Sequence, residues 1–463
     1  MPLRQLQRAA PLALAFGVAA LAGGPAPAAA QAASPAEAPR PARAESLVAI
    51  RAGRLVDVEK GVVLTDRVVL VRGETIEAVR PAAALGELPA GARVIDLSRH
   101  TVLPGLIDCH THLVDEVESG TANAAGPLER SGAQQAFAGV RNARRTLLAG
   151  FTTVRDVGTY RAFVDAALRD AVDDGTVPGP RMAVAGAYVT VSTGGGAVTG
   201  FATDVAIPRD LRFGEANSVS EVRQRVRELL NGGADFIKVI ATGAVLTRGT
   251  EPGVSEYTED EIRAAVETAA QYGTYVAAHA HGAEGIKRAV RAGVRSIEHG
   301  SLLDDEGIAL MRARGAWLVA DVYNGDYIAT EGKRQGWPAE FLRKNDETTE
   351  TQRAAFRKAV RAGVKIAYGT DAGVYPHGLN ARQLPYMVRY GMTPMQALQS
   401  ATIEAARMLR WDRRIGSIAP GKYADLIAVE GDALADLSRF ATVPFVMKGG
   451  VVVKQDSAVS AQR

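Results

Sequence analysis

The chain has 463 residues, of which 47% are hydrophobic, and a formal net charge of +3. This near-neutral balance does not provide the basic surface that binding to nucleic acid or to an anionic membrane requires. Cys109 is the only cysteine in the sequence, so an intramolecular disulfide is excluded and an apolar core must hold the fold.

The first thirty residues have the three-part pattern of a secretory signal peptide. Arg4 and Arg8 precede the apolar run 9–22, and Ala28 to Ala30 offer a small-residue cleavage site. The run is shorter than the ~20 residues that span a bilayer, which disfavours a membrane anchor, and no other stretch predicts a membrane span. We therefore expect residues 1–30 to be removed and the protein to be periplasmic or secreted.

After this segment, residues 31–45 are rich in alanine and proline and predict a disordered linker. Residues 46–100 read as β structure, with a hairpin turn at 72–74. The last part of the chain, 412–455, has the same character and a second hairpin turn at Gly449-Gly450. We expect one small β-sandwich domain built from both ends of the chain, although the two pieces could also pack separately.

Residues 101–411 alternate between short apolar runs and helical stretches. The apolar runs are 103–109, 152–157, 182–189, 236–241, 275–281, 295–299, 317–322 and 365–370. The clearest helical stretches are 134–149, 219–231, 259–272 and 353–362. Thr258 and Thr393 begin helices with capping boxes. Eight strands, each followed by a helix, predict an α/β fold of the (β/α)8 TIM-barrel type, with an open doubly wound sheet as the alternative.

Six of the seven histidines lie at or beyond the ends of these predicted strands. They are His110, His112, His279, His281, His299 and His377, whereas His100 lies in a polar turn and is expected to be exposed. The carboxyl ends of all barrel strands face one mouth, so these side chains should meet there. Two histidines two residues apart on a strand point to the same side, and imidazole is a favoured ligand of zinc.

Two further residues at strand ends complete the expected site. Lys238 lies in the middle of the apolar strand FIKVIATG and Asp371 follows the eighth strand in YGTDAG. A lysine buried near cations should lose its proton, and the neutral amine could add carbon dioxide to give an anionic carbamate ligand. A lysine extending to solvent and an aspartate serving as a turn residue are the simpler readings.

The ordered motifs resemble those of the metal-dependent amidohydrolase superfamily. They are VLPGLIDCHTHL (102–113), FIKVIATG (236–243), AAHAHG (277–282), SIEHGS (296–301), GTDAG (369–373) and GSIAPGKYADLIAVEGD (416–432). The resemblance covers nearly all of the chain after the signal peptide.

This resemblance implies a catalytic centre of two divalent ions. His110, His112 and Asp371 would bind the first ion, and His279 and His299 the second, with N6-carboxylated Lys238 as the bridge. Zinc is the metal we expect, although these ligands also accept manganese, cobalt and nickel. Asp371 would take a proton from the attacking water and pass it to the departing nitrogen, and His281 would contact the substrate.

Within the superfamily, the chain is similar to the secreted Xaa-Pro and Xaa-Arg/Lys dipeptidases and to the ochratoxin-degrading amidohydrolases. We therefore expect release of a C-terminal amino acid from a dipeptide or N-acyl amino acid. The glycine-rich stretch 191–204 is read as a selectivity loop or a plain surface loop. Tyr323, Tyr327 and His377 are candidate substrate contacts, with packing roles as the alternative.

Other activities on the same site remain open at this point. Hydrolysis of a cyclic amide, an ester or a lactone needs the same ligands, and a metal-binding protein without catalysis is a further alternative. Deaminases and imidazolonepropionases need no bridging lysine, so Lys238 disfavours them. A phosphotriesterase-like enzyme would usually lack the split β domain. Barrels of this type often assemble, so a homo-oligomer is also open.

Overall fold

The structure is a computed structural model that describes residues 47–115, 126–456 and 461–462. The predicted signal peptide and linker lie outside the described residues. Within this part of the chain, no helix combines the length and the apolar character that crossing a membrane would take.

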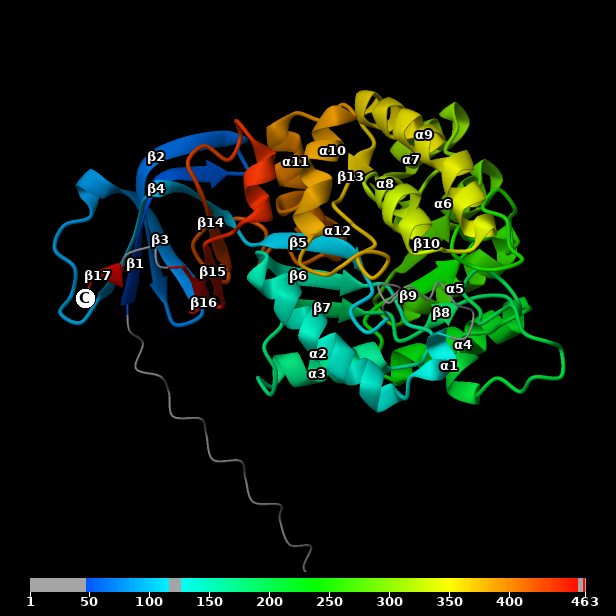
Figure 1. Cartoon of the computed structure of the whole chain (residues 1–463). Helices are drawn as coiled ribbons and strands as arrows, with labels where there is room; N and C mark the ends of the chain where they lie inside the picture. The colour runs from blue at the N-terminus through cyan, green and yellow to red at the C-terminus, as the bar shows by residue number, and fades with distance from the viewer. Residues whose placement is uncertain (1–46, 116–125, 457–460, 463) are drawn as a thin grey trace, which may run out of the picture. The chain divides into compact units, whose positions relative to one another are not determined.

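One sheet of eight strands unites the two ends of the described chain (Figure 1). Its strand order is β16-β15-β14-β4-β1-β2-β3, and β17 pairs with β4. The bounds are β1 (Leu47–Asp57), β2 (Val62–Arg72), β3 (Thr75–Pro81), β4 (Arg93–Pro104), β14 (Leu426–Glu430), β15 (Phe445–Lys448), β16 (Val451–Gln455) and β17 (Ala461–Gln462). Both predicted hairpins are confirmed, and the turns lie close together. A Cβ atom at Gly450 would meet the carbonyl oxygen of Gly73 at 2.0 Å, which explains the glycine there.

The expectation that His100 is exposed was wrong. His100 is only 6% exposed and lies in β4, opposite Glu430 of the antiparallel strand β14. The polar residues around His100 predicted a turn, but they belong to the twelve-residue strand β4. The strand β14, from the C-terminal part of the chain, pairs with β4 at this point. Contact between residues so distant in the sequence leaves no local signal.

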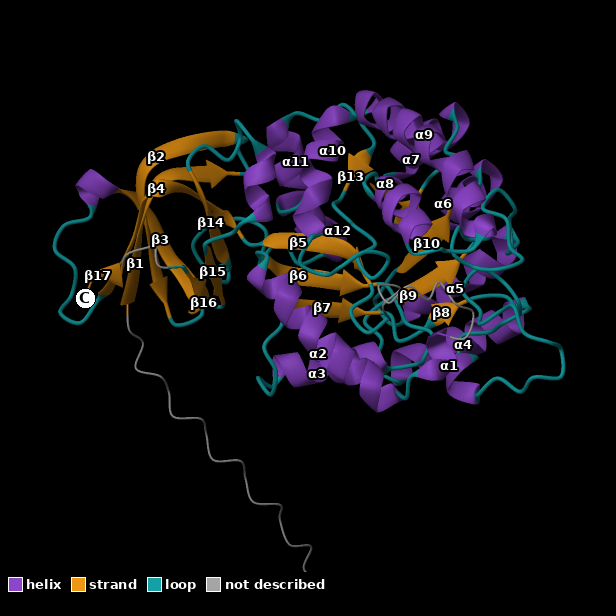
Figure 2. Ribbon diagram, in the orientation of Figure 1, coloured by secondary structure: helices purple, strands orange, loops and turns teal. Residues whose placement is uncertain are grey.

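The middle of the chain contributes short parallel strands that follow the predicted apolar runs. They are β5 (Leu106–Thr111), β6 (Phe151–Asp156), β7 (Arg181–Val184), β8 (Tyr188–Val189), β9 (Ile237–Ile240), β10 (Val276–Ala280), β11 (Ser296–His299), β12 (Trp317–Val319) and β13 (Lys365–Ile366). The predicted run 182–189 yields two short strands, β7 and β8, rather than one. Figure 2 shows helices around the outside of these strands.

The helices of the described chain are α1 (Gly126–Glu129), α2 (Gly132–Leu148), α3 (Val164–Asp173), α4 (Val219–Asn231), α5 (Glu259–Gln271), α6 (Ala283–Ala292), α7 (Asp305–Arg314), α8 (Asn324–Tyr327), α9 (Ala339–Ala362), α10 (Gln383–Arg389), α11 (Pro394–Ser400) and α12 (Ile403–Leu409). Capping boxes begin α5 at Thr258 and α11 at Thr393, as predicted. Helix α9 is longer than predicted, because its first half is too rich in charge to show an apolar period. A π-helical turn, η3 (Ile328–Gly332), follows α8.

The parallel strands form two hydrogen-bonded sheets rather than one continuous ladder. The sheet β5-β6-β7 has three strands, and the sheet β13-β12-β11-β10-β9-β8 has six. Segment 181–189 supplies β7 to the first sheet and β8 to the second. On the other side, the Asp371 amide donates to the His110 carbonyl and the His112 amide to the Ala372 carbonyl, both at 2.8 Å. These contacts bring the carboxyl ends of β5 and β13 together.

Candidate metal centre

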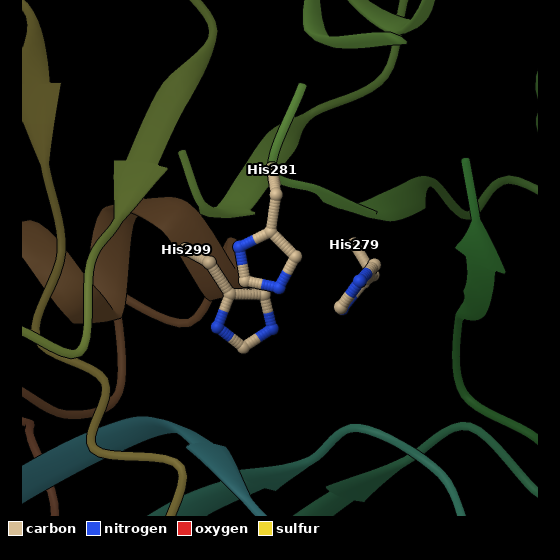
Figure 3. Close-up of side chains that lie close together, drawn as sticks. All are labelled: His279, His281 and His299. Atoms are coloured by element: carbon tan, nitrogen blue, oxygen red, sulfur yellow. The ribbon is translucent and has the colours of Figure 1, made fainter. Parts of the chain in front are cut away.

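The strand ends bring the predicted histidines into one buried cluster. His110 lies in β5, His279 in β10 and His299 at the end of β11, and His281 follows β10 directly. The ring centroid of His299 lies 4.8 Å from that of His110, 4.6 Å from that of His279 and 4.8 Å from that of His281. Figure 3 shows the rings of His279, His281 and His299 next to one another.

The ring of His110 is held by a buried ion pair. Its Nδ1 donates to the Glu298 carboxylate at 2.9 Å, and Arg155 donates to the other oxygen of that carboxylate at 2.7 Å. Ser296 also donates to Glu298 at 2.5 Å. All four side chains are buried. A carboxylate on one ring nitrogen fixes the tautomer and leaves the other nitrogen, Nε2, as a ligand.

Each of the other predicted histidine ligands also has one nitrogen engaged by the protein. His112 Nδ1 lies 2.9 Å from the Gly158 carbonyl oxygen, and His299 Nδ1 lies 3.1 Å from Asp321 Oδ1. His279 uses its Nε2 instead, 3.2 Å from a backbone carbonyl oxygen. The opposite nitrogen of each ring is therefore oriented and available for coordination.

The carboxylate of Asp371 lies close to both His110 and His112. Its Oδ1 is 3.4 Å from His110 Nε2 and 3.3 Å from His112 Nε2, while Asn324 donates to its Oδ2 at 3.0 Å. The backbone of Asp371 has a φ of +58°, and that of His299 has +67°. Both values lie in the left-handed region that non-glycine residues seldom adopt, and such strain clusters at functional sites.

Lys238 is buried beside these histidines. Its side chain extends from β9 into the cavity that the histidines line, and the residue is 2% exposed. Burial lowers the pKa of its amine to about 8. Burial also lowers the pKa of His110 and His279 well below the usual value, which keeps both imidazoles neutral. For His110, His279 and Lys238 these are the protonation states that metal binding requires. Burial also acts to lower the pKa of His112 and His299, but Asp371 and Asp321 beside them raise it above the usual value.

The donor set fits divalent ions. Ligand atoms of His279, His281 and His299 lie within 4.8 Å of one another, and so do those of His110, His299 and Asp371. Nitrogen and carboxylate donors in such groups suit zinc and related transition metals. The two groups share His299, so they lie next to each other in the structure.

His281 differs from the other histidines because its partner is a hydroxyl group. Its Nδ1 lies 2.7 Å from Ser301 Oγ, and its other face borders the cavity. The cavity has a volume of about 160 Å³. Tyr160 and Tyr188 line it from the side of β6 and β8.

The remaining predicted contacts lie elsewhere in the structure. His377 is buried and lies with Nε2 3.2 Å from the carbonyl oxygen of His112. Tyr323 packs against Tyr375 at 5.2 Å between ring centroids, and it lines a separate arginine-rich cleft together with Tyr327. Neither His377 nor Tyr323 is among the described residues that line the histidine cavity. Their role in substrate binding stays a prediction.

Sequence reasoning missed the residues that hold the ligands in place. Glu298 and Asp321 orient two histidines, and Arg155 balances the charge of Glu298. An acidic residue inside the apolar strand of SIEHGS was an available signal for Glu298. Strand alternation would have placed Glu298 and His299 on opposite sides, but the left-handed backbone of His299 breaks the alternation.

Comparison with known proteins places this geometry in a family. Residues 101–453 match the model of the amidohydrolase family. The chain belongs to the amidohydrolase family. The matched range contains every predicted ligand of the centre.

Individual relatives are more specific than the family model. Over 374 residues the chain is 33% identical to an ochratoxinase of Aspergillus niger, covering 76% of this chain and 75% of that protein. Among solved structures, a Xaa-Pro dipeptidase with bound methionine is 38% identical and has a TM-score of 0.82, covering 88% of this chain and 100% of the other. A prolidase complexed with N-methylphosphonate-L-proline is 32% identical, with a TM-score of 0.81 and coverage of 89% and 100%.

These relatives establish the class of reaction. The chain is a hydrolase that acts on amide bonds, in a family whose members are typically metal-dependent. Its fold neighbours have the TIM-barrel type of architecture. The predicted superfamily and the predicted relatives are therefore confirmed.

Proposed function

We propose that this amidohydrolase uses two divalent metal ions to release a C-terminal amino acid from a dipeptide or an N-acyl amino acid. One observation carries the proposal: the six predicted ligands, His110, His112, Lys238, His279, His299 and Asp371, all line a single cavity. The ochratoxinase and dipeptidase relatives support this substrate class.

His110, His112 and Asp371 would hold one ion, and His279 and His299 the other. What the ions supply when bound is hydroxide near neutral pH and polarisation of the scissile carbonyl. Carboxylated Lys238 would bridge the pair, and the lowered pKa of its amine favours the neutral form that reacts with carbon dioxide. Zinc is the proposed metal.

Asp371 and His281 would move and place protons. Asp371 accepts the proton of the attacking water and delivers it to the departing nitrogen, while Asn324 keeps the carboxylate in position. If the Ser301 hydroxyl donates to His281 Nδ1, the ring carries its proton on Nε2. His281 then donates to the substrate carbonyl from the wall of the cavity.

We also propose the organisation that the sequence predicts. A signal peptide (1–30) and a linker (31–45) would precede a β-sandwich domain made of residues 46–100 and 412–455. Residues 101–411 would form a closed (β/α)8 barrel. The protein would then act in the periplasm or outside the cell, and cell fractionation combined with N-terminal sequencing tests this.

The first experiment is a hydrolysis screen of the protein that starts at Gln31, loaded with zinc and bicarbonate. The panel contains dipeptides and N-acyl amino acids that end in Phe, Pro, Arg or Lys, together with ochratoxin A. Release of one class of C-terminal amino acid is the expected result. No turnover from a protein that carries two metal ions would reject this substrate class in favour of esters, lactones or cyclic amides.

The Lys238→Ala variant tests the two-metal part of the proposal. Loss of the bridging ligand should lower the bound metal below two ions per chain and reduce kcat/KM by at least about 100-fold. Metal content is measured by elemental analysis after gel filtration. Unchanged metal content and turnover would reject a bridging role for Lys238. The Lys358→Met variant, altered on the surface of α9, serves as the control.

A further inference from the structure

One carboxylate on the border of the histidine cavity has no role in the candidate metal centre. The described carboxylates that line this cavity belong to Asp115, Asp321 and Asp371. Asp371 is a predicted ligand, and Asp321 orients the ring of His299. Asp115 follows the predicted ligand His112 by three residues and contacts none of the predicted ligands through a described hydrogen bond. Its charge is therefore available for another purpose.

Neutral groups hold the Asp115 carboxylate in place. Gln135 donates to its Oδ1 at 3.2 Å, and the Tyr160 amide donates to its Oδ2 at 2.9 Å. A carboxylate oxygen has two acceptor positions, so each oxygen keeps one for a further donor. Burial raises the pKa of Asp115, which is the direction expected when no cation is bound to the carboxylate.

The arginine whose charge acts on Asp115 is bonded elsewhere. The Nε of Arg161 donates to Gln135 Oε1 at 3.1 Å, so it supports the amide that holds Asp115 rather than the carboxylate itself. Its Nη1 pairs with Asp210, and its Nη2 donates to a backbone carbonyl oxygen at 3.1 Å. The sequence 116–125, which follows Asp115, contains two glutamates and no lysine, arginine or histidine.

Two tyrosines lie close to this carboxylate. Tyr160 and Tyr188 line the same cavity, with their ring centroids 5.3 Å apart and their planes at 82°. Burial and, after it, the charge of Asp115 raise the pKa of both hydroxyl groups, that of Tyr160 to about 12, so both stay neutral. A carboxylate beside neutral aromatic rings is an environment that attracts ammonium ions, since the ring faces and the carboxylate are both negative.

Asp115 also lies near the floor of the cavity that the ligands form. A Cβ atom at Gly373 would meet the carbonyl oxygen of Asp115 at 2.9 Å and the Cβ atom of His112 at 2.8 Å, and Gly373 follows Asp371 by two residues. In a dipeptide, a single carbon atom separates the α-ammonium group from the scissile carbonyl. The charge of a lysine or arginine side chain lies several bonds further out. A carboxylate close to the floor therefore fits the α-ammonium group better.

We propose that Asp115, together with Tyr160 and Tyr188, binds the α-ammonium group of a dipeptide substrate. Two divalent ions in the centre would repel this group, and the Asp115 carboxylate offsets that repulsion. An N-acyl amino acid has no α-ammonium group and leaves the carboxylate without a cation. The subsite thus selects dipeptides over N-acyl amino acids. This inference rests on the proposed function and names the substrate class within it.

The test uses alanyl and propionyl derivatives of one C-terminal amino acid, because the two compounds differ only in the ammonium group. Phenylalanine is that amino acid unless the screen identifies a better one. The metal-loaded enzyme should have a kcat/KM at least about tenfold higher for the alanyl compound, the ratio that a hydrogen bond to a charged group provides. The Asp115→Asn variant should lower this ratio at least about tenfold. Equal values in the wild type, or an unchanged ratio in the variant, would overturn the subsite and leave the proposed function intact.

The Gln135→Met variant is the matched control for a purely structural role of Asp115. It removes one neutral donor from the carboxylate and keeps the charge. Both compounds should be affected alike, so the ratio of alanyl to propionyl turnover should stay within about threefold of the wild type. Loss of the ratio in Gln135→Met to the same extent as in Asp115→Asn would mean that Asp115 only supports the cavity, and would overturn the subsite.

Calorimetry with the same pair separates the subsite from the proposed function. If neither compound is hydrolysed, tighter binding of the alanyl compound to the metal-loaded protein, lost in Asp115→Asn, supports the subsite although the proposed function fails. Equal affinities, or no binding of either compound, overturn the subsite. Propionyl-lysine and propionyl-norleucine form a third arm. A preference for lysine that depends on Asp115, without one for the alanyl compound, would assign the carboxylate to a basic side chain and overturn the α-ammonium assignment.

Discussion

The metal floor and the pocket wall of the same cavity are built in different ways. The metal floor is the set of predicted ligands. Five of them lie on or directly after strands, namely His110, His112, Lys238, His279 and His299, and Asp371 lies five residues beyond the end of β13. The pocket wall consists of Gly195–Gly196, residues 244–247 and the face of α9 that bears Asn345, Thr348, Thr349 and Gln352. Buried carboxylates orient two rings of the floor, those of His110 and His299. In the wall, the side chain of Lys344 donates to a backbone carbonyl of the loop 244–247.

This difference separates chemistry from selectivity. Strand ends fix side chains precisely enough for metal binding, and the loops above them can vary without disturbing that geometry. We therefore expect changes in the support of the floor to affect metal affinity, and changes in the support of the wall to affect KM. Three predictions test whether the two regions are separable.

The largest effect is expected for Glu298→Gln in the support of the floor. The amide cannot balance the charge of Arg155 or accept from His110 as strongly, so the histidine ring loses its orientation. Metal affinity should fall about 10- to 100-fold, measured by competition with a chelator. The free energy of unfolding should fall by up to about 3–5 kcal/mol, because Arg155 keeps a buried charge without a full partner.

A double variant separates these two consequences. Arg155→Met in the Glu298→Gln background removes the unpaired charge and should recover part of the lost stability. Metal affinity should stay low, because His110 still lacks its carboxylate. Wild-type metal affinity in either variant would show that the floor does not depend on this ion pair.

A smaller effect is expected for Lys344→Met in the support of the wall. Methionine keeps most of the length of the side chain but cannot donate to the Thr247 carbonyl. KM for a dipeptide substrate should rise about tenfold, since a hydrogen bond from a charged donor contributes about 1.5–3 kcal/mol. Metal content should stay at the wild-type level, and kcat should change by less than about threefold.

The exposed Lys358 provides the matched control for this variant. Its side chain lies on the same helix, is 56% exposed and pairs with Asp305 at the surface. Lys358→Met should leave KM unchanged, because such surface pairs contribute little. Loss of metal in Lys344→Met, with the control unaffected, would contradict the separation of floor and wall.

The sequence predicts which residues lie together in the floor, and the reason is physical. Each ligand belongs to a short motif at the end of an apolar strand, and parallel strands bring such ends together whatever the length of the intervening chain. The helix starts at Thr258 and Thr393 are equally local, because a capping box is complete within four residues. Both the gathering of the predicted ligands and the start of these helices can therefore be predicted without the structure.

The residues of the pocket wall, and those that orient the histidines of the floor, could not be predicted from the sequence in the same way. The contact between Lys344 and Thr247 joins residues 97 positions apart, and that between His110 and Glu298 joins residues 188 apart. No local sequence pattern indicates which residues are paired across such separations. The burial of His100 was missed for the same reason, since its cover comes from β14 near the other end of the chain.

The smallest effect concerns the contact of Glu256 with Gly195, which belongs both to the glycine-rich stretch 191–204 and to the pocket wall. Both carboxylate oxygens of Glu256 lie 2.9 Å from the Gly195 amide, and burial raises the pKa of this carboxyl from 4.5 to about 7. Between these two values the folded protein binds more protons than the unfolded chain, so stability should fall as the pH rises from about 4.5 to about 7.

Glu256→Gln keeps an acceptor for Gly195 and does not ionise. Its free energy of unfolding, measured in urea and compared with wild type, should gain about 1–3 kcal/mol between pH 5 and pH 8. A constant difference across this range would mean that ionisation of Glu256 is tolerated, and that the wall is held by Lys344 and Thr247 alone.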